Sequence, residues 1–174
     1  MGYLSATRPF NFPRFADAEY FTDVERRQVE ALFDRLYPSD HANGVPGATD
    51  ARASRFLSRL LALDEEEYHK ITVWREAYRN GLILLDASAQ VSFGKKLTDL
   101  LVDQIDDFLG KLELGSAEGL PDDFDQRSFF RLLQEHCIKG CFADPRWGGN
   151  EDGIMWRWLG WVQPAEDIKF GEPT

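Results

Sequence analysis

The chain has 174 residues, of which 43% are hydrophobic, so it is long and apolar enough to form one domain around a substantial core. Its 30 acidic and 20 basic residues give a formal net charge of −10, which disfavours nucleic acid and anionic membrane surfaces as partners. No apolar run approaches the ~20 residues that a membrane-spanning helix needs, so we expect no direct insertion into a membrane.

Residues 1–20 form a distinct first segment, because they combine many aromatic residues with prolines. This composition is not typical of a helix, and it differs from that of a disordered tail, which is poor in aromatic residues. We therefore predict an extended aromatic arm that lies in a groove, either on this domain or on another protein. Residues 1–15 show no basic region followed by an apolar stretch, so we expect no signal peptide. The arm residues expected to contact a partner are Phe10, Phe12 and Phe15.

The next segment has the sequence signals of two helices. Thr22 and Glu25 have the spacing of a capping box, and the apolar periodicity that follows predicts a helix over residues 23–37 that ends before Pro38. Residues 38–49 contain the turn signals Asn43-Gly44 and Pro46-Gly47. A second helix is predicted over residues 50–62.

Apolar periodicity predicts four further helices. The third is expected to begin at Asp64 as its N-cap, to use acidic residues 65–67 to complement the helix dipole, to bury Trp74 and to end at Gly94. A fourth helix is predicted over residues 99–113. A fifth is predicted over residues 126–142 with Asp125 as its cap, and a short last helix over residues 153–161. Residues 164–174 read as a polar tail.

Together these patterns predict an all-α fold. No alternating strand pattern of useful length is present, and the helices are joined by short connections. We expect a single-domain, irregular bundle of five to six helices over residues 21–163, preceded by the extended N-terminal arm. Cys137 and Cys141 are spaced to share one face of the fifth helix, and we interpret them as buried thiols in its apolar stripe.

The loop over residues 142–153 is the most informative part of the chain. It contains one proline and three glycines around an Arg-Trp pair, and three more tryptophans follow it. Turn formers that fix an arginine and aromatic residues on a rigid loop are typical of a recognition surface. In a helix Trp156 and Trp158 point about 200° apart, so one side of this segment is expected to be exposed or covered by another chain. The partner-contact candidates here are Asp144, Arg146, Trp147, Asn150, Trp156, Trp158 and Trp161.

Common catalytic signatures are absent or weak. There is no dinucleotide-binding glycine motif, phosphate-binding loop, nucleophile elbow or zinc-protease motif. We interpret His41, His69 and His136 as surface or partly buried structural histidines. An alternative hypothesis remains, in which the chain is a free-standing carbohydrate-binding module or a hydrolase-like enzyme that uses Asp144, Asp152 and His136.

Several motifs, in this order along the chain, resemble the gluconate 2-dehydrogenase subunit 3 family. The resemblance runs from about residue 20 to 163. The most specific match is Gly140-Cys141-Phe142-Ala143-Asp144-Pro145-Arg146-Trp147-Gly148-Gly149-Asn150-Glu151-Asp152-Gly153, and weaker ones are Leu36-Tyr37-Pro38-Ser39-Asp40, Pro46-Gly47-Ala48, Tyr78-Arg79-Asn80-Gly81-Leu82 and Trp156-Arg157.

This resemblance implies a small, helical, cofactor-free subunit. Its partner in the family is a large FAD-dependent dehydrogenase of the glucose-methanol-choline (GMC) type, which oxidises sugars, glycosides, sugar acids or polyols. Some such complexes add an iron–sulfur cluster in the large subunit and a cytochrome subunit. The small subunit is expected to be non-catalytic and to help the large one fold, acquire FAD and be exported. Many members carry a twin-arginine signal that this chain lacks, so a periplasmic and a cytoplasmic location both stay open.

Overall fold

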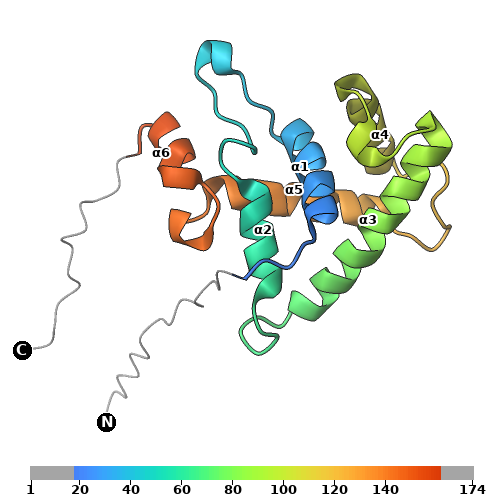
Figure 1. Cartoon of the computed structure of the whole chain (residues 1–174), viewed down its shortest axis with the longest axis horizontal. Coiled ribbons are helices and arrows are strands. Elements are labelled where there is room, and N and C mark those ends of the chain that lie inside the picture. The colour runs from blue at the N-terminus through green and yellow to red at the C-terminus, as the bar shows by residue number, and fades with distance from the viewer. Residues whose placement is uncertain (1–17, 162–174) are drawn as a thin grey trace, which may run out of the picture.

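The computed structural model describes residues 18–161, and within this range the chain forms six α-helices joined by turns and short 3₁₀ segments. They are α1 (Asp23–Leu36), α2 (Ala53–Ala62), α3 (Ile71–Phe93), α4 (Val102–Leu114), α5 (Gln126–Phe142) and α6 (Ile154–Trp158) (Figure 1). The only β pairing in the described range is an isolated bridge between Asp40 and Val45. The predicted all-α fold is therefore confirmed. The predicted arm contacts Phe10, Phe12 and Phe15 and the polar tail lie outside the described residues.

Helix α5 lies at the centre of the fold and packs against α1, α2 and α4. Figure 1 shows it crossing behind α1 and α2, with α3 and α4 on the far side from α6. Cys137 and Cys141 are buried free thiols on its covered face, as predicted. The Sγ atom of Cys137 lies 3.7 Å from the carbonyl oxygen of Phe33. Trp74 of α3 also belongs to the core, as predicted.

A glycine allows α2 and α5 to cross in close contact. A Cβ atom added at Gly140 of α5 would lie 2.7 Å from the carbonyl oxygen of Ala53, at the start of α2. Real side chains avoid such a distance to backbone, so a residue with a Cβ would push the two helices apart. This crossing matters for function because the loop after α5 folds back onto it.

Two predicted helix starts are confirmed by their caps. At α1 the amide of Glu25 donates to Oγ1 of Thr22 at 3.3 Å, and the amide of Thr22 donates to the Glu25 carboxylate at 2.9 Å. This reciprocal pair is the predicted capping box. At α5, Oδ1 of Asp125 accepts from the amide of Ser128 at 3.0 Å, and the helix covers residues 126–142 as predicted.

Two helices begin later than predicted. Helix α2 begins at Ala53 rather than near residue 50, because the amide of Ala51 bonds to Gly47 and Arg52 adopts a left-handed conformation with φ 53°. Helix α4 begins at Val102 rather than near residue 99. Residues 97–99 form a separate 3₁₀ turn, which is held by a hydrogen bond from the amide of Leu97 to Oδ1 of Asp86.

The predicted start of α3 at Asp64 is wrong, because the helix begins at Ile71. Residues 64–70 instead form turns that carry the chain from α2 to α3. Arg75 explains the difference, since its guanidinium donates to the carbonyl oxygens of Leu61 and Leu63, each at 2.7 Å. These bonds satisfy carbonyl oxygens at the end of α2, and the side chain that donates them lies one turn inside α3. Glu65 lies 3.6 Å from Arg75 and forms an ion pair with it, so the acidic run does not serve the helix dipole.

The connection between α4 and α5, residues 115–125, is fastened to α5 and to α3. The side-chain amide of Gln126 bonds to the amide and the carbonyl of Ala117, at 2.9 and 3.2 Å. Arg127 donates to the carbonyl oxygen of Leu114, and the hydroxyl of Ser88 donates to that of Glu118. The loop is therefore ordered although most of its side chains are exposed.

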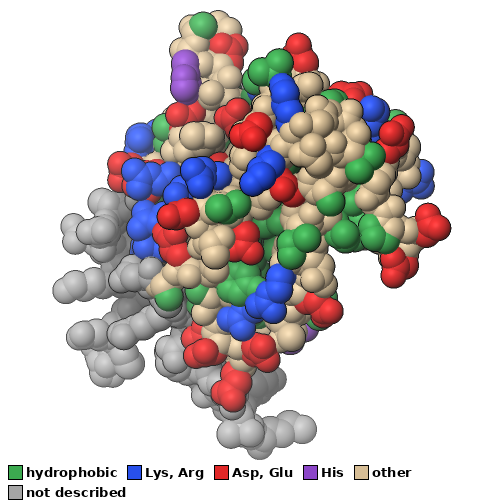
Figure 2. All heavy atoms as spheres, turned by 45° about the vertical axis from the view of Figure 1, so that its right-hand side comes forward, with side chains coloured by type: hydrophobic (Ala, Val, Ile, Leu, Met, Phe, Trp, Pro, Cys, Tyr) green, Lys and Arg blue, Asp and Glu red, His purple; other side chains and the backbone are tan. Residues whose placement is uncertain are grey.

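No helix within residues 18–161 has both the length and the apolar character that crossing a bilayer requires. Acidic side chains are scattered over the face shown in Figure 2, with basic side chains between them.

Candidate partner-binding site

The loop between α5 and α6 is built around Asn150, a polar residue with no exposed surface. Its backbone amide donates to the carbonyl oxygen of Gly140 at 3.0 Å, and its side-chain nitrogen donates to that of Ala143, also at 3.0 Å. Its Oδ1 atom accepts from the amide of Met155 at 2.9 Å. Asn150 therefore ties the end of α5 to the start of α6. Because it lies inside the protein, its predicted contact with a partner does not fit the structure.

The same loop presses against the crossing of α2 and α5. An added Cβ atom at Gly149 would overlap the carbonyl oxygen of Gly140, so only glycine fits there. The amide of Glu151 donates to the carbonyl oxygen of Ala51 at 3.2 Å. The carboxylate of Glu151 lies 3.3 Å from Arg52 and 3.8 Å from Arg55. The loop is thus held by backbone contacts with α5 and with Ala51, and by ion pairs from the start of α2.

Asp144 and Arg146 form a pair at the outer edge of the loop. Asp144 caps the 3₁₀ turn Pro145–Trp147 by accepting from the amide of Arg146 at 3.0 Å. The guanidinium of Arg146 donates to both carboxylate oxygens, at 2.9 and 2.6 Å. These side-chain hydrogen bonds hold the pKa of Asp144 below its ordinary value. The Arg146 side chain remains 75% exposed, so the pair presents an oriented guanidinium to solvent.

The tryptophans that follow divide into an inner and an outer group. Trp147 and Trp156 are half-buried, and the indole nitrogen of Trp156 donates to the carbonyl oxygen of Phe142 at 3.1 Å. Trp158 is 41% exposed, and Trp161 is 47% exposed with its ring packed edge-on against Trp156. The prediction that one side of this segment is exposed is therefore confirmed. We call Trp158, Leu159 and Trp161 the α6 apolar surface.

A groove lies between α6 and the loop that precedes α2. Figure 1 shows that loop rising beside α6. The groove has a volume of about 410 Å³, and its loop wall includes His41, Val45, Pro46 and Asp50. Its other wall includes Ile154, Arg157 and Trp158. We call it the α6 groove.

Sequence reasoning missed most residues of the α6 groove. The turn signals of residues 38–49 indicated a loop but carried no signal that its side chains meet α6, more than 100 positions away in the chain. Of the residues lining the groove, only Trp158 was a predicted contact. Nε2 of His41 lies 3.0 Å from Asp50, and this bond together with the charge of the carboxylate raises the pKa of His41 above its ordinary value.

The residues of the alternative enzyme hypothesis are not brought together. His136 has no exposed surface, so it is more deeply buried than predicted, and its Nδ1 atom bonds to the hydroxyl of Tyr78 at 2.9 Å. Asp144 pairs with Arg146, and Asp152 is exposed in a left-handed conformation with φ 51°. Within residues 18–161 no hydrogen bond or ion pair joins any two of His136, Asp144 and Asp152. They therefore do not form one catalytic site.

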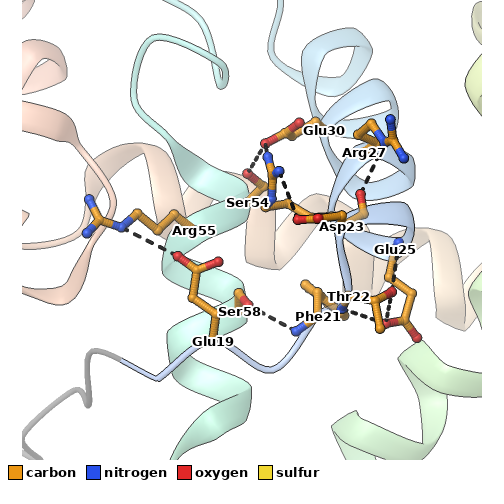
Figure 3. A network of polar contacts seen from close by, with 11 residues as sticks. Glu19, Phe21, Thr22, Asp23, Glu25, Arg27, Glu30, Ser54, Arg55 and Ser58 are labelled. Carbon is orange, nitrogen blue, oxygen red and sulfur yellow. Dashed lines mark hydrogen bonds and ion pairs between the residues drawn. The ribbon is translucent and has the colours of Figure 1, made fainter.

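A second cleft, of about 530 Å³, lies between α1 and α2. Figure 3 shows the polar network around it, which links Glu19 to Arg55, and Glu30 to Ser54. Arg26 also pairs with Glu30, at 2.8 Å. The acids and bases that line this cleft form ion pairs with one another or, for Arg52, with Glu151, and acidic and basic residues are equally numerous in the lining, so it has no concentrated charge for a ligand. The described residues contain no group of three or more His, Cys, Asp or Glu side chains arranged to hold a metal ion.

Comparison with known proteins identifies a family. A sequence model of the family described as gluconate 2-dehydrogenase subunit 3 matches residues 23–163. This range contains all six helices and the whole loop between α5 and α6. No curated protein and no solved structure matches the chain.

Proposed function

The chain belongs to the gluconate 2-dehydrogenase subunit 3 family, a family of dehydrogenase-complex subunits, and we propose that it is the non-catalytic small subunit that stabilises a large FAD-dependent partner. The proposed partner is a GMC-type dehydrogenase that oxidises sugars, glycosides or polyols. In this proposal FAD, and the iron–sulfur cluster that some complexes add, belong to the large subunit. A cytochrome subunit completes the complex where electrons pass to a further acceptor.

The observation that carries the proposal is the exposed α6 apolar surface on a rigid support. Trp158, Leu159 and Trp161 leave large apolar areas in water, and Leu159 is 60% exposed. Tryptophan is enriched among the residues that dominate binding energy at protein interfaces. Because Asn150 fixes the start of α6 through buried hydrogen bonds, little conformational entropy is lost when a partner covers this surface.

Stabilisation of the large subunit would then follow from mass action. A small subunit that binds only the folded, FAD-loaded partner stabilises it by RT ln(1 + [L]/Kd), which is about 2.7 kcal/mol at a concentration of about 100 Kd. No chemical step by the small subunit is needed for this effect. The exposed guanidinium of Arg146 lies on the same loop and adds a polar contact at the edge of the interface.

The test is co-expression with a candidate large subunit, encoded next to this chain, followed by size exclusion and an absorbance scan for flavin. We expect the wild-type pair to co-elute with bound FAD. The double variant Trp158→Ala/Trp161→Ala should weaken the complex by about 30-fold or more, because truncated interface tryptophans typically lose at least ~2 kcal/mol. The same experiment on Trp158→Ala alone avoids disturbing the packing of Trp161 on Trp156.

The matched control is Val73→Ala/Ile83→Ala, which removes two other exposed apolar side chains on α3. Circular dichroism should show the same helix content for all variants. Equal binding by the tryptophan variant and the control would remove the α6 apolar surface from the interface. Turnover of a sugar by the isolated chain without flavin would reject the accessory role itself.

A further inference from the structure

The α6 groove has one rigid wall formed by the loop before α2. Asp40 and Val45 exchange two backbone hydrogen bonds, of 2.8 and 2.9 Å, which close the tip of this loop. Oδ2 of Asp50 accepts from the amide of Gly47 at 2.9 Å and so fixes the end of the loop that leads into α2. An added Cβ atom at Gly47 would lie 2.8 Å from the carbonyl oxygen of Tyr37, so the loop packs backbone against backbone. The wall is therefore formed in advance of any ligand.

The opposite wall joins an apolar side chain to a cation. Trp158 lines the groove and is also part of the α6 apolar surface, so the two features are continuous. Arg157 is exposed and donates from Nη1 to the carbonyl oxygen of Asp152. Among residues 18–161 it has no carboxylate partner, although the whole chain carries ten more acidic than basic residues.

Asp50 and Arg157, the oppositely charged residues that line this groove, are engaged differently. Asp50 is the acidic residue of the lining, and its carboxylate already accepts from the amide of Gly47 and bonds to His41 at 3.0 Å. Arg157 lines the groove next to the Trp158 indole and, among residues 18–161, pairs with no carboxylate. A groove of this kind fits a carboxylate carried on an apolar stem.

We propose that the α6 groove receives an acidic side chain from an extended segment of the large subunit, with Arg157 binding the carboxylate and Trp158 covering the segment's apolar part. This inference rests on the proposed function, since it names the partner chemistry at the same surface. Two observations favour a partner segment over a free ligand. The groove opens onto the α6 apolar surface, and its volume of about 410 Å³ admits a few side chains at the edge of a larger interface.

The test compares three single variants in the co-expressed complex, with the affinity measured by biolayer interferometry at low and high salt. Arg157→Gln should weaken binding by about tenfold or more, because it leaves the partner's carboxylate buried without an opposite charge. It should also reduce the salt dependence of binding, since one interfacial ion pair is lost. Arg157→Lys should recover part of the affinity.

Arg131→Gln is the matched control. Arg131 is exposed on α5, and its guanidinium donates to the hydroxyl of Ser128 rather than to a carboxylate. We expect this variant to bind as the wild type does. Far-UV circular dichroism and thermal melting confirm that each variant is folded before its affinity is compared.

Two results would overturn the inference without touching the proposed function. The first is a wild-type complex that forms normally, loses affinity with Trp158→Ala/Trp161→Ala and is unaffected by Arg157→Gln. The second is a loss of affinity in Arg157→Gln that Arg131→Gln reproduces, which would make the effect one of net charge rather than of the groove. If no complex forms with the wild-type chain, the proposed function fails instead.

Discussion

His136 is the most unusual single residue of the core. It has no exposed surface, its Nδ1 atom bonds to the hydroxyl of Tyr78, and its Nε2 atom has no hydrogen-bond partner within residues 18–161. The ring of Trp74 packs edge-on against it at a centroid distance of 4.6 Å. Burial lowers the pKa of His136 to about 4, with the charge of Lys139 acting in the same direction and that of Glu135 against it. The native state therefore holds this imidazole neutral.

This neutral imidazole predicts a loss of stability in mild acid. Between pH 6.5 and about 4 the unfolded chain binds a proton at His136 that the folded chain does not, so stability falls as the pH drops through this window. Between about pH 7.5 and about pH 4.5, His136 is expected to reduce the free energy of unfolding by about 2–3 kcal/mol. Urea denaturation at both pH values should show a smaller loss in His136→Gln than in the wild type. Identical losses in the two proteins would show that His136 is charged in the native state.

At the scale of elements, the contact between the loop after α5 and the α2–α5 crossing depends on glycine. Gly140 lets the two helices meet, and Gly149 lets the loop lie on the carbonyl of Gly140. Both obstacles are backbone atoms, which cannot rotate aside as a flexible side chain can. Packing at this crossing therefore sets the position of α6 and of the surface that it presents.

Gly149→Ala is expected to destabilise the fold by about 1–3 kcal/mol or more, because the added methyl overlaps backbone. The control is Gly110→Ala in α4, where an added Cβ has no neighbour within 4 Å. That variant should raise the free energy of unfolding by about 0.5–1 kcal/mol, since alanine is the better helix former. Urea denaturation of both variants measures the difference. If Gly149→Ala left the free energy of unfolding unchanged, the loop would be able to move away from the crossing without destabilising the fold.

The elements also show which features could be predicted from local sequence. The capping box of Thr22 and Glu25 and the cap of Asp125 lie within three residues of the groups that they satisfy, so the starts of α1 and α5 were predicted correctly. The start of α3 was not, because Arg75 bonds to carbonyls more than ten residues earlier. Asn150 was assigned to a partner for a similar reason, since its burial depends on contacts with Gly140 and Ala143. The α6 groove joins distant segments, so no local pattern marked it.

The whole described molecule is organised around one hydrophobic core. A single cluster of buried side chains extends from Phe21, before α1, to Met155 in α6, and it includes residues of all six helices. The short α6 is therefore not an appendage, because Met155 inserts into the same core as Leu133 of α5. A partner that binds α6 is thereby coupled to the stability of the entire fold.

A single core predicts cooperative unfolding. Helix content by far-UV circular dichroism and core packing by near-UV circular dichroism should give the same midpoint in a urea titration. Met155→Ala should lower both midpoints together and reduce the free energy of unfolding by about 2–5 kcal/mol, since it opens a cavity in the shared core. Separate midpoints, or a variant that shifts one probe alone, would indicate that α6 unfolds on its own.

The anchored connection between α4 and α5 has a consequence for limited digestion. Residues 121–123 are a proline and two aspartates, all exposed, and exposed loops of this kind are the usual sites that endopeptidases cut. Ser88, Gln126 and Arg127 hold the backbone that precedes it, at Glu118, Ala117 and Leu114, so the chain cannot be drawn into an enzyme's cleft without breaking these bonds. Cleavage between α4 and α5 must then wait for the rare opening of the native state, and its rate reports that opening.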